Sequence, residues 1–160
     1  MSFVSKLFNK QDKDEHIYSP INGDCIPIDQ VKDKVFSTKA MGDGVGIIPK
    51  QGVVYSPIEG KVVAIFPTNH AIGLINDKGV EILIHIGIDT VELNGKGFES
   101  FVKQGDKVKA HQKLIAFDLK EIQQKYDSTV MVIITNSNGV ELQIQEATSL
   151  KIDDILFKIK

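Results

Sequence analysis

The residues of this sequence best suited to chemistry are two histidines, His70 and His85, each in an apolar context. His85 lies within residues 80–88, where every even-numbered residue is Val or Ile. Strict alternation of this kind is typical of a β-strand with one face on the core, so the even-numbered side chains are predicted to form a core face. His85 is odd-numbered, and its ring is therefore predicted to lie on the opposite face of the strand.

A turn signal, Asn-Asp-Lys-Gly at residues 76–79, precedes this strand and predicts a hairpin with the segment upstream. If Ile75 faces Val80, one-for-one pairing places His70 directly opposite His85, with Cβ atoms about 4.5–5.5 Å apart. The same register places Ile72 opposite Leu83 and gives the two rings an apolar surround. A bulge at Gly79 would shift this register by one residue.

Two facing imidazoles could serve three kinds of chemistry, and the pattern alone leaves all three open. One ring could be a nucleophile, because an imidazole with a pKa near about 6.5 is largely neutral at physiological pH. The pair could ligate zinc, with Asp89 or a partner's carboxylate completing the site, or the two rings could act as acid and base. His16, near a linker, and His111, in a polar turn, are interpreted as packed or solvated residues without a catalytic role.

The elements that must position these rings are predicted to be short β-strands. From Ile17 onward, runs rich in Val, Ile and Thr are separated by Gly, Pro, Asn and Asp. The hexapeptide Tyr-Ser-Pro-Ile-Asn-Gly at residues 18–23 recurs as Tyr-Ser-Pro-Ile-Glu-Gly at 55–60, which indicates a duplicated β unit. Only residues 118–126 predict a clear helix, and residues 91–104 could contain a helical turn. The predicted fold class is all-β, an antiparallel β-sandwich or barrel with an internally duplicated motif and only short helical turns.

Length and composition place these elements in one compact domain. A chain of 160 residues with a net charge of −2 and no long Lys/Arg block has no general attraction for nucleic acid. The single cysteine, Cys25, cannot form an internal disulfide, and the chain shows neither a signal peptide nor an apolar run of membrane-spanning length, so a cytoplasmic location is predicted. Residues 1–15 are predicted to be a flexible N-terminal segment and residues 16–160 the folded domain.

Competing motifs are weak. The glycine-rich run at residues 42–46 is followed by Ile-Ile-Pro rather than by a helix, so it is interpreted as a tight loop and not as a phosphate-binding one. Residues 105–114 are similar to a strand-turn-strand of biotinyl and lipoyl carriers, but a Met-Lys-Met hairpin is absent. A zinc hydrolase on a related β scaffold, using His70, His85 and Asp89, remains an alternative that metal analysis of the purified protein would test.

Several longer segments carry a resemblance to a known family. Phe-Pro-Thr-Asn-His-Ala at residues 66–71 and Val-Glu-Ile-Leu-Ile-His-Ile-Gly-Ile-Asp-Thr-Val-Glu-Leu at 80–93, supported by residues 39–44 and 95–98, resemble the enzyme IIA component of the glucose family of the bacterial sugar phosphotransferase system. The resemblance extends from about Ile17 to the C-terminus and implies a type-1 EIIA domain, an antiparallel β-sandwich with a duplicated motif. It implies a phosphocarrier that takes a phosphoryl group from HPr and passes it to the IIB domain of a sugar permease. It further implies regulatory protein partners and a location peripheral to the inner face of the membrane. No cofactor would be required, although His70 and His85 could bind zinc in a complex.

The resemblance also implies roles for individual residues. His85 would be the phosphorylated nucleophile, His70 the second imidazole that stabilises the phosphate, and Thr68 the residue that orients His70. The backbone carbonyl of Gly87 would accept a hydrogen bond from His85. An apolar rim with two flanking carboxylates would bind the partners; its members are Val35, Phe36, Met41, Phe66, Ile72, Leu83, Asp33 and Asp89. The chain departs from the family pattern at Ala40, where relatives commonly carry larger aliphatic residues.

Overall fold

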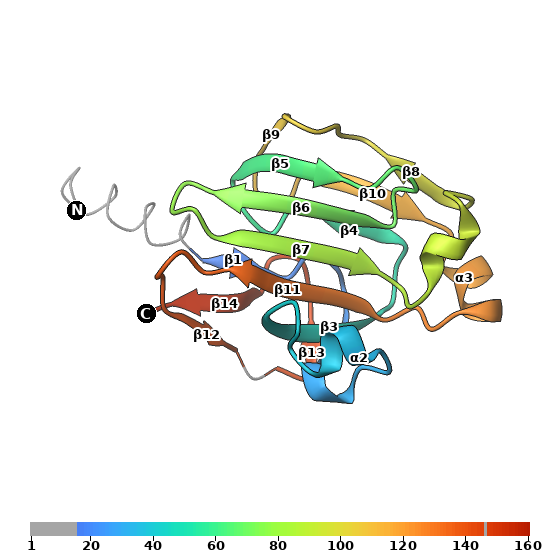
Figure 1. Cartoon of the computed structure of the whole chain (residues 1–160), viewed down its shortest axis with the longest axis horizontal. Coiled ribbons are helices and arrows are strands. Elements are labelled where there is room, and N and C mark those ends of the chain that lie inside the picture. Colours follow the sequence, from blue (N-terminus) through green and yellow to red (C-terminus); the bar gives the residue numbers. More distant parts are fainter. Residues whose placement is uncertain (1–15, 146) are drawn as a thin grey trace.

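A computed structural model describes residues 16–145 and 147–160, and the predicted flexible segment, residues 1–15, lies outside this described part (Figure 1). The described chain is mostly antiparallel β-structure. Its largest sheet has eight strands in the order β13 (Ser149–Leu150), β2 (Gly23–Pro27), β3 (Asp43–Pro49), β11 (Val130–Asn136), β7 (Glu81–Ile86), β6 (Ala71–Asn76), β5 (Gly60–Ile65) and β9 (Lys107–Val108). Two three-stranded sheets have the orders β1 (Ile17–Tyr18), β14 (Ile155–Ile159), β12 (Leu142–Ile144) and β4 (Val53–Tyr55), β10 (Lys113–Phe117), β8 (Phe98–Ser100).

The sheets form a sandwich and do not close into a barrel, which confirms the all-β class and decides between its two forms. In Figure 1 the central strands of the large sheet lie in front, and β4 and β10 lie behind them. The main core fills the space between the layers: Val54 of β4 and Ile115 of β10 join Leu74 and Ile84 of the large sheet in one buried cluster. This burial of apolar surface between two layers is the principal stabilising interaction of such a fold.

The repeated hexapeptide is confirmed as a structural duplication. The two copies contact one another reciprocally, because Tyr18 N donates to Pro57 O (2.9 Å) and Tyr55 N donates to Pro20 O (2.8 Å). In each copy the serine hydroxyl donates to the carbonyl two residues on, with distances of 2.8 and 2.7 Å. Each copy runs into a corresponding strand, β2 or β5, and the large sheet reads β13-β2-β3-β11 followed by β7-β6-β5-β9, so its two halves meet at the β11–β7 pair.

The predicted core face of β7 is confirmed over most of its length. Val80, Ile82, Ile84 and Ile86 are at most 1% exposed and belong to the main core. Ile88 instead belongs to a second, smaller apolar cluster on the outer face of the large sheet. The buried members of this outer cluster are Ile28, Val31, Phe36, Ala71, Leu83, Ile88, Met131 and Ile133.

The helices of the described residues are all short. The predicted helix is confirmed as α3 (Leu119–Lys125), whose first turn is capped because Glu121 N donates to Asp118 Oδ1 (3.1 Å). The 3₁₀ helix η2 (Thr90–Leu93) overlaps the ambiguous stretch at 91–104, which also contains β8. Two helices were not predicted, η1 (Ile28–Gln30) and α2 (Lys34–Ser37). Within the described residues no helix has the length and apolar character needed to cross a bilayer.

The interpretation of residues 42–46 as a loop is wrong, because Asp43 to Gly46 belong to β3 in the interior of the large sheet. Glycine is used here for close approach between strands: a Cβ atom on Gly44 would lie 2.0 Å from the carbonyl oxygen of Val132 on β11. The two glycines are typical of a loop and concealed this strand from sequence analysis, although its Val45 and Ile47 are buried in the main core.

Candidate active site

The hairpin that carries the histidines differs from the predicted one by one residue in register. Ala71, not His70, is paired with His85, and Ile72 is paired with Ile84. The turn explains the shift: Asn76 N donates to Val80 O (3.1 Å), and Gly79 adopts a left-handed φ of 79°. The predicted register is therefore wrong, in the way a bulge at Gly79 produces.

The two rings nevertheless lie side by side, with centroids 5.0 Å apart and planes at 81°. His70 directly precedes β6 and follows a turn in which Asn69 has a left-handed φ of 57° and its N–H donates to Phe66 O (2.8 Å). This turn interrupts the alternation of side chains along the strand. The His70 side chain can therefore point to a different face of the sheet from the one that alternation along β6 would predict. Its carbonyl oxygen accepts a hydrogen bond from Ile86 N (2.7 Å), which ties the turn to β7 beside His85.

The hydrogen bonding of His85 determines which ring nitrogen is free. Its Nδ1 lies 2.8 Å from the carbonyl oxygen of Gly87. A carbonyl oxygen can only accept, so Nδ1 carries the proton and Nε2 keeps its lone pair in the neutral ring.

The environment of His85 also keeps the ring uncharged. Burial, reinforced by the charge of His70, lowers the pKa of His85 to about 4, although the Gly87 carbonyl, Asp33 and Asp89 act in the opposite direction. At neutral pH His85 is therefore an uncharged imidazole with Nε2 available as a nucleophile.

His70 is almost fully enclosed, with 3% of its surface exposed. Its Nδ1 lies 2.5 Å from the hydroxyl oxygen of Thr68, and burial lowers the pKa of the ring. The ring of Phe66 packs edge-on against it with centroids 5.4 Å apart, while Phe36 packs against His85 at 5.1 Å. One aromatic ring therefore packs against each imidazole and restricts the orientations that it can adopt.

The lowered pKa of His85 predicts that acid weakens the fold. The unfolded histidine titrates near about 6.5 and the folded one near 4, so between these values the unfolded chain binds more protons and the free energy of unfolding falls as the pH decreases. The loss should reach about 3 kcal/mol and level off below the folded pKa. Urea unfolding from neutral pH down to about pH 4 should show a shallower pH dependence in His85→Gln than in the wild type. Parallel curves would contradict the assignment.

The proposed rim divides into exposed and buried members. Val35, Met41 and Phe66 are 50%, 40% and 41% exposed and are available to a partner. Phe36 and Leu83, predicted as rim residues, are instead buried in the outer cluster, at 4% and 7%, because the segment that contains η1 and α2 covers this face of the sheet.

Ile72 was predicted at the rim and is fully buried in the main core. The one-residue shift of register turns its side chain inward, so its assignment to a surface is wrong.

The two flanking carboxylates lie at turns next to His85 and influence its titration. Asp33 caps α2 by accepting from Val35 N (2.9 Å), and Asp89 has a left-handed φ of 60° before η2. Sequence reasoning missed Val91, which is 50% exposed on η2 just after Asp89. An apolar residue between the polar Thr90 and Glu92 was the signal available for it.

Within the described part of the chain, no group of three or more His, Cys, Asp and Glu side chains is arranged to hold a metal ion. His70 and His85 alone supply two nitrogen ligands, whereas catalytic zinc normally takes three protein ligands. Nothing in the geometry favours the zinc hydrolase.

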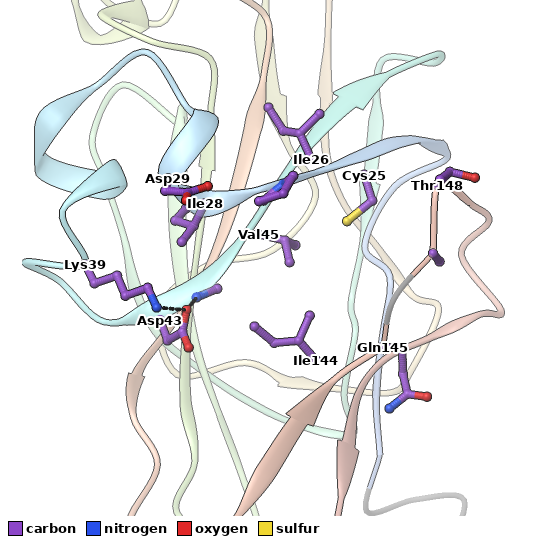
Figure 2. A pocket seen from close by; sticks show the side chains of 13 residues that line it. Cys25, Ile26, Ile28, Asp29, Lys39, Asp43, Val45, Ile144, Gln145 and Thr148 are labelled. Carbon is purple, nitrogen blue, oxygen red and sulfur yellow. Dashed lines mark hydrogen bonds and ion pairs between the residues drawn. The ribbon is translucent and has the colours of Figure 1, made fainter.

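A groove elsewhere on the surface contains the only cysteine. Figure 2 shows Cys25 beside Ile26, Val45 and Ile144, with the Lys39–Asp43 ion pair at one end (3.6 Å). Neither site histidine lines this groove, and burial raises the pKa of the Cys25 thiol, which disfavours the reactive thiolate. The histidine pair is therefore the better candidate for chemistry.

Several known proteins are similar to this chain over most of its length. The glucose-specific EIIA component of a Staphylococcus epidermidis strain (ATCC 35984) is 46% identical over 159 residues, covering 97% of this chain and 92% of that protein. The glucose-specific EIICBA component of Staphylococcus saprophyticus is 48% identical over 145 residues, which cover 90% of this chain but only 21% of that longer protein. Among solved structures, the glucose permease IIA from Mycoplasma capricolum superimposes with a TM-score of 0.84 at 43% identity, covering 89% of this chain and 93% of that one.

The family match spans most of the chain. Residues 15–140 match the family described as phosphoenolpyruvate-dependent sugar phosphotransferase system, EIIA 1. This range contains both histidines, Thr68, Gly87 and every residue of the rim. The chain therefore belongs to the EIIA type 1 family of the phosphoenolpyruvate-dependent sugar phosphotransferase system, whose members are phosphotransferase components in sugar uptake.

Proposed function

We propose that His85 is the phosphoryl carrier of this protein, loaded by phospho-HPr and unloaded by the IIB domain of a sugar permease. The observation that carries the proposal is the hydrogen bond from Nδ1 of His85 to Gly87 O, which leaves Nε2 as the free nitrogen beside a second imidazole. The relatives are named glucose-specific, so glucose uptake is the first transport reaction to test. The reaction is expected on the cytoplasmic side of the membrane, where the permease would meet this chain.

The transfer needs no base at the nucleophile. The Nε2 lone pair of His85 attacks phosphorus, the bond from phosphorus to the donor's nitrogen breaks, and its electron pair returns to the donor's ring. The phosphorylated ring keeps its Nδ1 proton and gains positive charge, which the Gly87 carbonyl faces and stabilises. Return of the phosphoryl group to an acceptor reverses these steps. Because such transfers depend mainly on positioning and charge stabilisation, a rigid sheet is a suitable support.

His70 stabilises the group in transfer. If the Thr68 hydroxyl donates to Nδ1 of His70, the proton of that ring lies on Nε2, from which it can be donated to a phosphoryl oxygen. The ring centroid lies 5.0 Å from that of His85, within reach of a phosphoryl group on the neighbouring Nε2. In that arrangement Thr68 sets the tautomer of His70, as Gly87 sets that of His85.

Exposed apolar side chains around the histidines fit a docking surface for both partners. Val35, Met41, Phe66 and Val91 are each at least 40% exposed, and burying such surface contributes about 25 cal/mol per Å². The S. saprophyticus relative is named an EIICBA component, so in that protein a B component accompanies the A component. This arrangement supports a IIB domain as the acceptor.

Incubation with phosphoenolpyruvate, enzyme I and HPr, followed by intact mass measurement, tests the function directly. One phosphoryl group per chain is expected, only when all three components are present with the Mg²⁺ that enzyme I requires, and without added zinc. Absence of the label in a folded protein would refute the phosphocarrier assignment. Loss of transfer after chelation of zinc, restored by zinc, would instead support the metal site.

The docking surface predicts opposite outcomes for two substitutions to aspartate. Met41→Asp changes an exposed side chain, so HPr association should weaken about tenfold or more, with unfolding free energy within about 0.5 kcal/mol of the wild type. Leu83→Asp buries a charge in the outer cluster and should cost several kcal/mol of stability. Titration calorimetry and urea unfolding give the two quantities.

A matched control for the docking surface is Phe101→Asp, an exposed apolar side chain that follows β8 of a smaller sheet. It should leave HPr association unchanged. Equal weakening in Met41→Asp and Phe101→Asp would mean that the four exposed residues are not the docking surface.

A further inference from the structure

We propose that Thr90 and Asp127 are positioning residues for the phosphoryl acceptor: they fix the backbone of residues 86–88 and thereby aim the Gly87 carbonyl at Nδ1 of His85. The inference rests on the proposed role of His85 and adds the part of the chain that selects its reactive tautomer. Neither residue touches the imidazole rings through a side-chain hydrogen bond; both act through the backbone.

The Gly87 carbonyl needs such support because no strand holds it. β7 ends at Ile86, and Gly87 has a left-handed φ of 77°, a conformation in which glycine has wide freedom. If this peptide rotated, Nδ1–H of His85 would lose its acceptor. The proton could then move to Nε2, and the ring nitrogen that must attack phosphorus would have no lone pair to offer.

The peptide that joins Gly87 to Ile88 is aimed by its other end. The Gly87 carbonyl and the Ile88 N–H belong to one planar trans peptide and point in opposite directions. Ile88 N donates to the carbonyl oxygen of Asp127 (2.9 Å), so this hydrogen bond directs the Gly87 carbonyl the other way, toward His85. The peptide before it is fixed similarly, because Gly87 N donates to Thr129 O (2.9 Å).

The Asp127 carboxylate holds both of these acceptors in place. Its Oδ1 accepts from the backbone N of Thr129 (2.9 Å) and from the Thr129 hydroxyl (2.6 Å), closing a compact turn before β11. The two carbonyl oxygens that restrain Gly87 and Ile88 are those of the first and last residues of this turn. A carboxylate outside the histidine pair therefore determines where the acceptor's carbonyl points.

Thr90 restrains the same tripeptide from the other side. Its side chain is fully buried, and its hydroxyl donates to the carbonyl oxygen of Ile86. Its methyl group covers Gly87 so closely that a Cβ atom there would lie 2.4 Å from Thr90 Cγ2. The Ile86 N–H also has a partner, because it donates to His70 O (2.7 Å). The backbone groups on both sides of the Gly87 carbonyl are thus held by hydrogen bonds, and the carbonyl is restricted to the direction of His85.

The test is the tautomer of His85 in the unphosphorylated protein, read from the ¹⁵N shifts of its ring. In the wild type the Nδ1–H form should dominate. In Thr90→Val, which keeps the side chain's shape but removes the hydroxyl, and in Asp127→Ala, the Nε2–H form should become the major one. Acceptance from phospho-HPr should slow several-fold, because only the remaining Nδ1–H form keeps a lone pair on Nε2.

Two matched controls remove comparable bonds elsewhere. Thr135→Val deletes a threonine hydroxyl that donates to Glu81 O (3.3 Å) on the same strand pair. Asp154→Ala deletes a carboxylate that accepts from Lys151 N (2.9 Å) in another turn. Both should leave tautomer and transfer unchanged. Thr90→Ser keeps the hydroxyl and should restore the wild-type tautomer, and Asp127→Asn, with one acceptor oxygen retained, replaces Asp127→Ala if the alanine variant does not fold.

Folded variants with wild-type tautomer populations would overturn the proposal, as would slower transfer without any change of tautomer. If the tautomer shifts as expected but the wild type accepts no phosphate, the positioning role stands and the proposed function fails. If the wild type is phosphorylated and the tautomer never responds, the function stands and the positioning role fails.

Discussion

Replacing His85 by glutamine should abolish phosphoryl acceptance from phospho-HPr while the domain stays folded. Glutamine has no ring nitrogen with a nucleophilic lone pair, so the step that forms the bond to phosphorus is lost altogether. The fold should survive, because His85 is only partly buried and lies on the outer face of the sheet, away from the main core. The measurement is intact mass after incubation with phosphoenolpyruvate, enzyme I and HPr, with circular dichroism as the test of folding.

His111→Gln is the matched control for this result. His111 packs against Tyr18 with ring centroids 4.7 Å apart and shares no contact with the site, so this variant should be labelled fully. The wild-type label should be acid-labile, as phosphohistidine is. Full labelling of His85→Gln, or an acid-stable product, would move the acceptor to another residue.

Replacing His70 by glutamine should separate the two half-reactions. Glutamine keeps a donor near the phosphate but cannot carry positive charge as the ring can. His70→Gln should still accept a phosphoryl group from phospho-HPr, a transfer that is close to balanced. It should pass the group to the permease domain about 10²–10³ times more slowly, the usual cost of losing one group that stabilises charge in the transition state.

Thr68→Val is expected to show a milder form of the same defect. It removes the hydroxyl 2.5 Å from His70 Nδ1 and frees the ring without deleting it. Acceptance is measured by mass and delivery by sugar phosphorylation, each with the wild type alongside. If His70→Gln were not phosphorylated while His85→Gln was, the roles of the two imidazoles would be exchanged.

Local sequence patterns predicted much of this fold because they reflect interactions between residues that are close in the sequence. Alternation along residues 80–88 predicted the buried face of β7, since successive side chains of a strand point to opposite faces. Asp118 before an apolar helical stretch predicted the beginning of α3 because a carboxylate caps the first turn. The repeated Tyr-Ser-Pro-Ile signal predicted a duplication that the reciprocal Tyr18–Pro57 and Tyr55–Pro20 hydrogen bonds display.

Two kinds of prediction failed: the interpretation of a glycine-rich stretch as a loop, and the placement of residues on a surface that another segment of the chain covers. Glycine at residues 44 and 46 reads as a turn, but between neighbouring strands it permits close approach, which depends on what lies opposite. Leu83 was assigned to the partner-binding rim because it lies on the face of β7 opposite the predicted core face, and alternation along a strand identifies only one buried face. The segment that contains η1 and α2 contributes Ile28, Val31 and Phe36 to cover that face, and the alternation of β7 contains no sign of it.

The candidate site, too, was predictable only in part from the sequence. By itself the sequence determined that His85 lies on the outer face of its strand, that His70 belongs to the neighbouring segment, and that a resemblance assigns both to phosphoryl transfer. Only the tertiary structure decided how the rings meet, because the register depends on the conformation at Gly79 and the direction of His70 on the left-handed Asn69. The carbonyl that selects the tautomer of His85 is likewise aimed by Asp127, which is far away in the sequence. Hydrogen bonds between distant segments form only once the sheet has brought β7 and β11 together, and no local pattern of residues encodes them.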